Sequence, residues 1–416
     1  MAERLFRWYD SGMSSSKVTR SRSREADAPG PQSRFLRVVA TALPFVVLAA
    51  GAGSADHDVI PDPPPLSVET PLPAGLRIVP DTVTVSGLSS GGFFAHQFHV
   101  ANSSLVTGAG ILAGGPYACT EIIPNPFWPS WMLDPLSAAL VGCTHYFGSR
   151  FWGLRPRPPS AEDAAAAVET AYGAGDIDDP ANLADDRVWL FHGRLDDVVP
   201  PAVAESLADL YRLLGVDTEA LRVNSGDPER PASHGMPVDG FKGESRFPVR
   251  GCDEHEPPFI IECGWDAAGQ LLRHLHPDGF PEVPGDAHGS GSLTAFDQSA
   301  FFEPSETIGL GKVGYIYVPD VCGVEECRLH VAFHGCRQNA DAQGAERVHD
   351  DFIRDAGYNR WAAAARIVVL YPQATETEAN PNGCWDFWGY GGPGWRTKDG
   401  LQMRAVRAMI DRLLEG

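Results

Sequence analysis

The chain is poor in basic residues and, after its first 55 positions, has only three lysines. Residues 56–416 carry 25 Lys and Arg against 50 Asp and Glu, a formal charge of −25. This excess of negative charge repels nucleic acids and anionic membrane surfaces. We therefore expect neither nucleic acid nor a membrane as a partner. The charge suits a neutral substrate, and we expect a monomer.

The chain also lacks a hydrophobic run long enough to span a bilayer, for which about 20 residues are needed. Its run Val38–Ala50 has 13 residues, follows Arg34 and Arg37, and precedes the small residues Gly51–Ala55. This order is typical of an export signal. We predict that residues 1–55 form a basic leader with a secretion signal and that the protein is extracellular or periplasmic. A short membrane anchor or a core helix is the alternative.

No C-x-x-C pair is present, and the histidines do not cluster with the cysteines at zinc spacing, so no metal site is predicted. The eight cysteines are an even number in a chain expected to be exported, which favours disulfides. Eight cysteines allow 105 connectivities. The simplest pairing joins neighbours: Cys119 with Cys143, Cys252 with Cys263, Cys322 with Cys327, and Cys336 with Cys384.

The most informative motif is a G-x-S-x-G sequence at Gly87–Gly91. The β-branched Val83 and Val85 precede it, as in a buried strand, and aromatic residues at helical spacing follow it. Between a strand and a helix, this motif forms a strained turn that exposes the central serine hydroxyl. Ser89 is therefore the candidate nucleophile; a glycine-rich turn without catalytic function is the alternative.

The rest of the chain alternates strand-like and helix-like segments, which indicates an α/β fold with a mainly parallel sheet covered on both faces. We interpret residues 56–75 as a proline-rich extended leader and residues 76–416 as a single catalytic domain. Strands are expected at 108–113, 187–191, 219–224, 314–318, 329–333 and 367–371, and helices at 161–172, 202–214 and 403–414.

An acid and a base can be placed after later strands. The strand 187–191 leads into a loop with Asp196 and Asp197, of which we prefer Asp196 because it begins the D-x-x-V-P turn. His234 follows one helix and one strand later, where an imidazole could shuttle the serine proton while a carboxylate fixes its tautomer. The alternatives are helix-capping aspartates and a surface histidine.

A second oxyanion donor is expected from His334-Gly335-Cys336, which follows the strand 329–333. An H-G turn after the third strand of α/β-hydrolases supplies such an amide. We assign the backbone amides of Ser90 and Cys336 to the oxyanion hole and His334 to shaping the turn. His96 and His99, behind the serine turn, are interpreted as structural.

This order is unusual, because the oxyanion strand follows the serine by some 240 residues instead of preceding it. Joining the tail of the chain to its head restores the usual succession. The sequence therefore predicts a circularly permuted α/β-hydrolase, a rearrangement tolerated when domain termini lie near one another at the surface.

With these residues placed, the chain resembles the secreted short-chain polyhydroxyalkanoate depolymerases, in particular their circularly permuted single-domain type. The shared motifs occur in the same order over about residues 76–414: Val85–Gly92, Ala113–Cys119, the Asp196 turn, Ser233-His234, Leu329–Cys336, Gly357–Trp361, Leu370–Ala374 and Asn380–Asp386. The resemblance implies a Ser89–His234–Asp196 triad, an oxyanion hole at Ser90 and Cys336, no cofactor, and a polyester or oligoester of 3-hydroxybutyrate as substrate.

Two features depart from the family pattern. The family reads C-W-D-W, with the second tryptophan near the substrate cleft, whereas this chain reads Cys384-Trp385-Asp386-Phe387-Trp388. We expect Trp385, Phe387 and Trp388 to contact substrate, with recognition altered by the loss of an indole N–H at Phe387. The stretch 122–157 is rich in Trp, Phe and Pro. It is either a lid or polymer-contacting surface, or a disulfide-pinned loop on the core.

The sequence thus favours a serine esterase that acts through an acyl-enzyme. The nearest alternative is a carboxylesterase for other small or plant-derived esters, such as feruloyl or acetyl groups. A third is a catalytically inactive polymer-binding protein, which phosphonate labelling of Ser89 would distinguish from an enzyme.

Overall fold

The computed structural model describes residues 70–123, 135–144, 158–226, 228–229, 231–240, 250–284, 290–303, 308–342 and 348–415. The predicted export signal, most of the proline-rich leader and most of the stretch 122–157 lie outside these residues, so what we expect of them stays a prediction.

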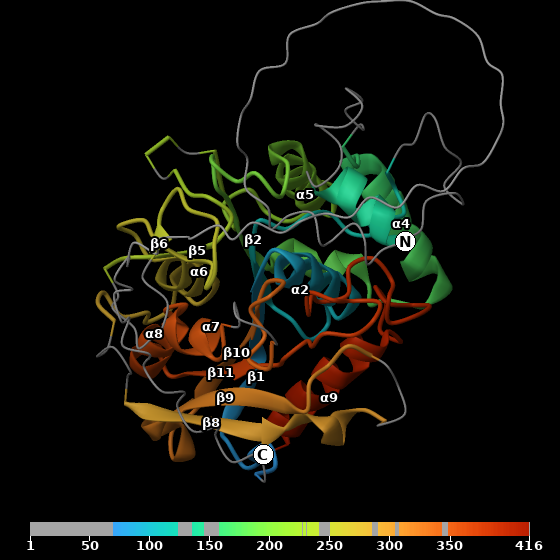
Figure 1. The fold of residues 1–416 in the computed structure, drawn as a ribbon. Helices are drawn as coiled ribbons and strands as arrows, with labels where there is room; N and C mark the ends of the chain where they lie inside the picture. Colours follow the sequence, from blue (N-terminus) through green and yellow to red (C-terminus); the bar gives the residue numbers. More distant parts are fainter. Residues whose placement is uncertain are drawn as a thin grey trace, which may run out of the picture. The chain divides into compact units, whose positions relative to one another are not determined.

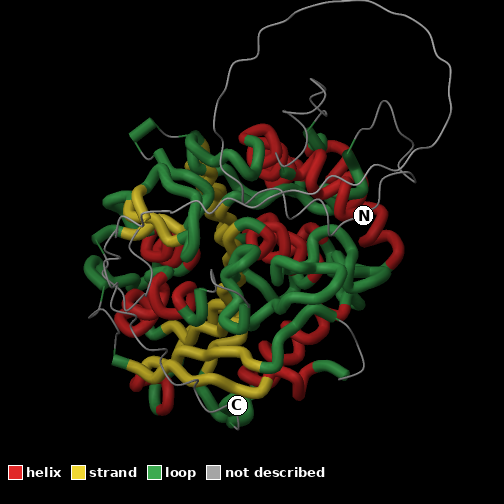
Figure 2. Tube along the Cα trace, viewed as in Figure 1, coloured by secondary structure: helices red, strands yellow, loops and turns green. Residues whose placement is uncertain are grey.

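An eight-stranded sheet in the order β4-β3-β2-β1-β10-β11-β9-β8 forms the centre of the fold (Figures 1 and 2). Strands β4 to β11 in this order run parallel, and β9 and β8 run antiparallel at one edge. This confirms the mainly parallel sheet. The strands are β1 Ile78–Leu88, β2 Gly108–Leu112, β3 Arg187–His192, β4 Leu221–Ser225, β8 Gly291–Asp297, β9 Val313–Pro319, β10 Cys327–Phe333 and β11 Ile367–Tyr371.

Strand β3 is apolar on both faces because each face packs against a helix, α5 or α6. In β3, Val188 and Leu190 face one hydrophobic core, and Trp189 and Phe191 face the other. Successive side chains of a strand point to opposite faces, so both cores draw on the same short run. Trp189 and Phe191, whose ring centroids lie 6.0 Å apart, therefore belong to the second core.

The helices divide between the two faces of the sheet. Figure 1 shows α6, α7 and α8 on one side of the strands and α2 and α9 on the other; α6 contacts α8, whereas α2 and α9 both contact β1. The helices are α2 Ser90–Ala101, α3 Pro135–Ala138, α4 Ala161–Ala174, α5 Pro201–Leu213, α6 Ala267–Leu275, α7 Asp351–Asp355, α8 Tyr358–Ala365 and α9 Leu401–Leu414. The short turns are η2 Ala139–Cys143, η3 Pro180–Asp185, η4 Gln298–Phe301 and η5 Asp320–Gly323.

The strand order confirms the permutation. Strand β10 lies directly beside β1 and pairs with it in parallel, with Val331 opposite Val85. If the C-terminus is joined to the N-terminus and the elements are counted from β8, the order is β9, β10, β11, α9 and then the serine strand β1. The H-G strand then precedes the serine strand, as in α/β-hydrolases.

A second, small parallel sheet was not expected from the sequence. It has the order β5-β7-β6, with β5 Met236–Val238, β6 Arg250–Gly251 and β7 Ile260–Glu262. Strand β5 begins two residues after His234, and strands β6 and β7 end next to Cys252 and Cys263, which form a disulfide. The small sheet therefore anchors the loop on which the candidate base lies.

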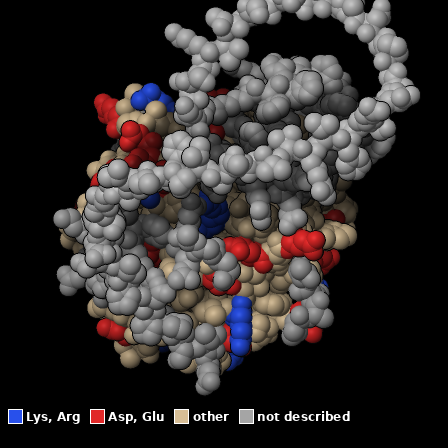
Figure 3. Space-filling model, viewed as in Figure 1, with Lys and Arg blue, Asp and Glu red and all other residues tan. Residues whose placement is uncertain are grey.

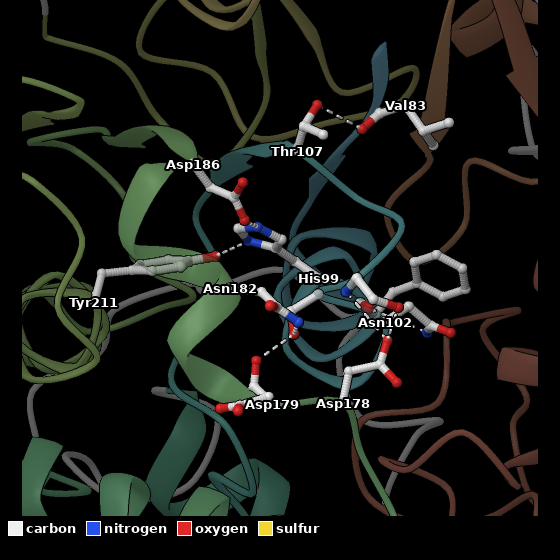
Figure 4. Close-up of polar contacts among 12 residues, drawn as sticks. Val83, His99, Asn102, Thr107, Asp178, Asp179, Asn182, Asp186 and Tyr211 are labelled. Carbon is white, nitrogen blue, oxygen red and sulfur yellow. Dashed lines mark hydrogen bonds and ion pairs between the residues drawn. The ribbon is translucent and has the colours of Figure 1, made fainter. Parts of the chain in front are cut away.

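The two histidines of α2 are fully buried, as expected of structural residues. His99 contacts Asp186 Oδ2 through Nε2 at 2.9 Å and the Tyr211 hydroxyl through Nδ1 at 3.1 Å (Figure 4). His96 packs edge-on against Tyr211, with ring centroids 4.8 Å apart. These contacts join α2 to α5 and to the residue before β3.

Among the described residues, no helix is long and apolar enough to cross a bilayer, and no group of three or more His, Cys, Asp or Glu is placed to hold a metal ion. On the face drawn in Figure 3, acidic side chains form several clusters, whereas basic ones occur as isolated spots. This face is in keeping with the negative charge of the sequence.

Candidate active site

Ser89 occupies a sharp turn between β1 and α2. Its backbone has the uncommon positive φ of 57° with ψ −122°, and the residue is half-buried and therefore reachable. A Cβ on Gly87 would lie 2.1 Å from the Gly91 carbonyl oxygen, and one on Gly91 would lie 2.4 Å from that of Phe333. The two glycines are therefore required because any side chain would collide with nearby backbone. The strain of the turn lies at Ser89, a non-glycine residue with a positive φ.

Asp196 and His234 form a buried pair. Asp196 Oδ2 lies 2.8 Å from His234 Nδ1, and the side chains are 1% and 7% exposed. The other carboxylate oxygen accepts the amides of Val198 at 2.8 Å and Val199 at 2.9 Å. Burial acts to raise the pKa of Asp196, but His234 and these hydrogen bonds outweigh it, and the pKa is lowered. The carboxylate is thus ionised and held in one orientation.

The second aspartate of this loop has a different partner. Asp197 Oδ1 lies 3.4 Å from Nδ1 of His255, whose ring meets that of His234 edge-on at 5.2 Å. The hydrogen bond from His255 is the main cause that lowers the pKa of Asp197. Of the two candidate acids, the structure therefore places Asp196 at His234. His192 Nε2 binds the Val199 carbonyl at 2.8 Å, which braces the same loop.

Ser89, Asp196 and His334 follow the carboxyl ends of parallel strands β1, β3 and β10. The carboxyl ends of parallel strands lie at one edge of a sheet, where sites collect. Within the described part of the chain, no hydrogen bond joins Ser89 to His234. Their cooperation is therefore a proposal from this shared edge.

The turn after β10 lies against the serine. A Cβ on Gly335 would be 3.5 Å from Cβ of Ser89. His334 is fully buried, its Nε2 accepts the Ala374 amide at 3.1 Å, and its Nδ1 therefore donates to the Gly335 carbonyl at 2.7 Å. Burial lowers the pKa of His334 to about 4, so the ring is neutral near pH 7. His334 shapes the turn.

The candidate oxyanion amides belong to Ser90 and Cys336. Ser90 begins α2, where the first N–H groups have no acceptor within the helix and carry its positive dipole end. Within the described residues, no acceptor is recorded for the amide of Cys336. The Cys336–Cys384 disulfide ties this turn to the aromatic loop after Asn380.

The described cysteines form four disulfides, and each joins neighbours in the sequence. They are Cys119–Cys143, Cys252–Cys263, Cys322–Cys327 and Cys336–Cys384, and no described cysteine is free. This is the simplest of the possible pairings.

The expected role of Trp385 does not fit its position. Trp385 is 0% exposed and packs against Phe94 and Phe333, with ring centroids 4.7 and 4.9 Å away. It is part of the packed core and has no exposed surface that could contact substrate in this structure. Phe387 stacks on Phe93 of α2 at 4.5 Å.

Trp388 is also nearly buried and lies edge-on to Phe387 at 5.0 Å. Asp386, which had no predicted role, accepts backbone amides of Trp388, Gly389, Tyr390 and Gly391 at 2.7 to 3.2 Å. Burial raises the pKa of Asp386 despite these bonds. The aspartate thus folds the aromatic loop around itself.

Two residues that contact the site from other parts of the chain had no role predicted from the sequence. His255 and Gln338 lie within the disulfide-closed loop Cys252–Cys263 and just after the oxyanion turn, respectively. The only available signal for the first was the predicted disulfide, and Gln338 had none.

No protein-family model matches the chain. The chain is 35% identical over 353 residues to a poly(3-hydroxybutyrate) depolymerase of Delftia acidovorans, a match covering 83% of this chain and 62% of that enzyme. It is 31% identical over 362 residues to a polyhydroxybutyrate depolymerase of Talaromyces funiculosus, covering 83% and 93% of the two chains.

Solved structures give the same result. A PHB depolymerase variant complexed with an R3HB trimer matches with a TM-score of 0.68, and the PHB depolymerase from Penicillium funiculosum with 0.66. Both are 29% identical to this chain and cover 83% of it and 99% of their own length.

Proposed function

The chain belongs to the polyhydroxybutyrate depolymerase family, and from this premise we propose that it is a secreted serine esterase that hydrolyses poly(3-hydroxybutyrate) or its oligomers. The observation that carries the proposal is Ser89, which has a positive φ and lies at the same sheet edge as the buried Asp196–His234 pair. One of the two solved relatives supports the substrate class, because it is complexed with an R3HB trimer.

In the proposed reaction, Ser89 Oγ attacks the ester carbonyl carbon while His234 Nε2 takes the serine proton. The tetrahedral oxyanion is bound by the amides of Ser90 and Cys336. Its collapse expels the alcohol end of the chain, which receives the proton from His234, and leaves an acyl-serine. Water, deprotonated by His234, then releases the carboxylic acid and restores Ser89.

Asp196 supports this cycle by holding Nδ1 of His234 as the protonated nitrogen, so that Nε2 faces the reaction. The carboxylate also stabilises the imidazolium that forms in each step. Its second oxygen accepts the amides of Val198 and Val199, which keeps the carboxylate from rotating away from His234.

A neutral polyester is compatible with the acidic protein, because its attraction to the enzyme would depend on apolar contact and not on charge. The four disulfides support secretion, since such bonds persist in oxidising compartments.

The test measures soluble 3-hydroxybutyrate products released from amorphous poly(3-hydroxybutyrate) by the wild type, Ser89→Ala and Ser104→Ala. We expect release by the wild type and by Ser104→Ala, whose serine is exposed and bonds Asp178, and none by Ser89→Ala. Cleavage of a short p-nitrophenyl ester without polymer release would instead indicate an esterase for other substrates. Activity retained in Ser89→Ala would contradict the proposed nucleophile.

A further inference from the structure

The side-chain amide of Gln338 bridges two segments that are separate in the sequence, the turn after β10 and the loop Cys252–Cys263. Gln338 is 1% exposed. Its Oε1 accepts the Gly335 amide at 2.7 Å, and its Nε2 donates to the Pro258 carbonyl at 3.0 Å. The first contact lies in the turn after β10, and the second in the loop Cys252–Cys263. One buried side chain thus connects the oxyanion turn to the disulfide-closed loop.

The loop Cys252–Cys263 is in turn bonded to the residues around His234. The Phe259 carbonyl, next to that of Pro258, accepts the Met236 amide at 2.8 Å, and the Cys252 carbonyl accepts the Ser233 amide at 2.8 Å. The Ser233 hydroxyl also donates to the Glu254 carbonyl. His234 is therefore held on both sides by backbone of this loop.

On the other side of the bridge, the Gly335 carbonyl accepts hydrogen bonds from one side chain and one backbone N–H, while the Gly335 N–H is held by the Gln338 side chain. His334 Nδ1 donates to the Gly335 carbonyl at 2.7 Å, and the backbone N–H of Gln338 donates to the same oxygen at 3.3 Å. In a planar trans peptide, the N–H points opposite to the C=O. Fixing the Gly335 carbonyl therefore fixes the direction of the Cys336 N–H.

We propose that Gln338 is a positioning residue, which sets the Cys336 amide relative to Ser89 and His234 through its bonds to Gly335 and Pro258. The inference rests on the proposed function, because it assigns that amide to the oxyanion. Preorganised donors act on the charge that develops in the transition state, and a small misplacement costs rate more than substrate binding.

The residue type follows from the two bonds. An amide side chain of this length offers one acceptor for Gly335 and one donor for Pro258 without a charge, whatever the pH. Methionine has nearly the same length and neither group. An ionised glutamate keeps the acceptor but sets a carboxylate oxygen against the Pro258 carbonyl, whereas a protonated glutamic acid restores both an acceptor and a donor.

The first experiment compares wild type, Gln338→Met and Asn359→Leu on p-nitrophenyl butyrate, with inhibition by an alkylboronic acid as a tetrahedral analogue. Asn359 is a matched control: it is buried and its amide also bridges two partners, Ile353 and Tyr371, at 2.8 and 2.7 Å. In Gln338→Met we expect kcat to fall about 10- to 100-fold with a small change in KM. The boronate inhibition constant should rise in parallel.

Binding of a 3-hydroxybutyrate oligomer in the Ser89→Ala background should be equal with and without Gln338→Met. A merely structural role would leave kcat as high as in Asn359→Leu, or would weaken oligomer and boronate equally, and either result overturns the proposal. Hydrolysis that persists in Ser89→Ala alone would instead overturn the proposed function, so the two failures are distinguishable.

The second variant is Gln338→Glu, which keeps the size of the side chain. Burial raises the pKa of a carboxyl group. We expect its kcat, divided by that of the wild type, to be highest at pH 5 and to decline toward pH 9 as the carboxyl ionises. A ratio as low as that of Gln338→Met at every pH would overturn the proposal.

Discussion

Asp196 and Asp197 are neighbours in the chain, yet their carboxylates bind different histidine rings, His234 at 2.8 Å and His255 at 3.4 Å. Asp196 is buried, whereas the Asp197 side chain is 72% exposed. The buried one is therefore the aspartate that we propose as the orienting acid.

In Asp196→Asn, the amide oxygen can keep the hydrogen bonds from Val198 and Val199, so the side-chain NH2 group replaces Oδ2 beside His234. As a donor, this group no longer favours the proton on Nδ1. We predict that kcat falls about 10³- to 10⁴-fold in Asp196→Asn, as expected when the imidazole loses its productive tautomer. Asp197→Asn serves as the control and should lose less than about 10-fold, because exposed ion pairs contribute little. Steady-state kinetics on a soluble ester would measure both. A larger loss in Asp197→Asn would reverse the assignment.

The local part of the site was predictable because it is written in a continuous segment. The valines of β1, the glycines around Ser89 and the aromatic residues of α2 all reflect close backbone approach or burial. Asp196, which the sequence favoured over Asp197, is the one that contacts His234, and the D-x-x-V-P turn lets this first aspartate accept the amides of Val198 and Val199.

The parts that could not be predicted depend on pairing between distant segments. Strands β5, β6 and β7 have only two or three residues, too few for a periodic pattern. Their pairing joins the segment after His234 to the Cys252–Cys263 loop, which is distant in the sequence. The burial of Trp385 was missed for a related reason. Aromatic residues in a loop look alike in sequence, and only the packing of Phe94 and Phe333 around Trp385 shows that it belongs to the core.

The position of Trp385 gives a second prediction. Trp385→Ala should lower the free energy of unfolding by about 3–5 kcal/mol, because it removes a fully buried large aromatic side chain. The ratio of kcat/KM for an oligoester to that for p-nitrophenyl acetate should stay as in wild type, since a side chain with no exposed surface is not expected to contact substrate. Denaturant unfolding and the two assays check this. A selective loss on the oligoester would restore the substrate-binding role.

The two disulfides that flank β10 give a third prediction. Cys322–Cys327 precedes or begins the strand, and Cys336–Cys384 follows it. Removing the first by Cys322→Ala/Cys327→Ala should cost about 2 kcal/mol of stability, and removing the second by Cys336→Ala/Cys384→Ala about 4 kcal/mol, since the closed loops have sequence separations of 5 and 48.

Only the second pair should affect the reaction, because it holds the turn that carries the Cys336 amide. We expect kcat to fall about 10-fold or more in the variant lacking Cys336–Cys384, measured where both proteins are fully folded, and to stay near wild type in the other. Equal kcat in the two variants would show that the turn keeps its geometry without the disulfide.

The last prediction concerns stability in acid. His96 is fully buried, both of its ring nitrogens lack a hydrogen-bond partner within the described residues, and burial, with a smaller contribution from His99, lowers its pKa from 6.5 to about 3. Between these two values the unfolded chain binds a proton that the folded protein does not. Stability therefore rises with pH in this range and is lost as the pH falls below 6.5.

At pH 5 this one histidine should cost about 2 kcal/mol relative to pH 8, from 1.5 pH units at about 1.36 kcal/mol each. In His96→Phe, whose ring can keep the edge-on contact with Tyr211, that contribution is absent. The drop in Tm from pH 8 to pH 5 should then be smaller than in wild type, although not zero, because burial also lowers the pKa of His276 to about 3 and of His334 to about 4. Thermal unfolding at both pH values measures the difference. An equal drop in the two proteins would mean that His96 is already neutral at pH 5 in the unfolded chain, or charged in the folded one, and either contradicts the argument from burial.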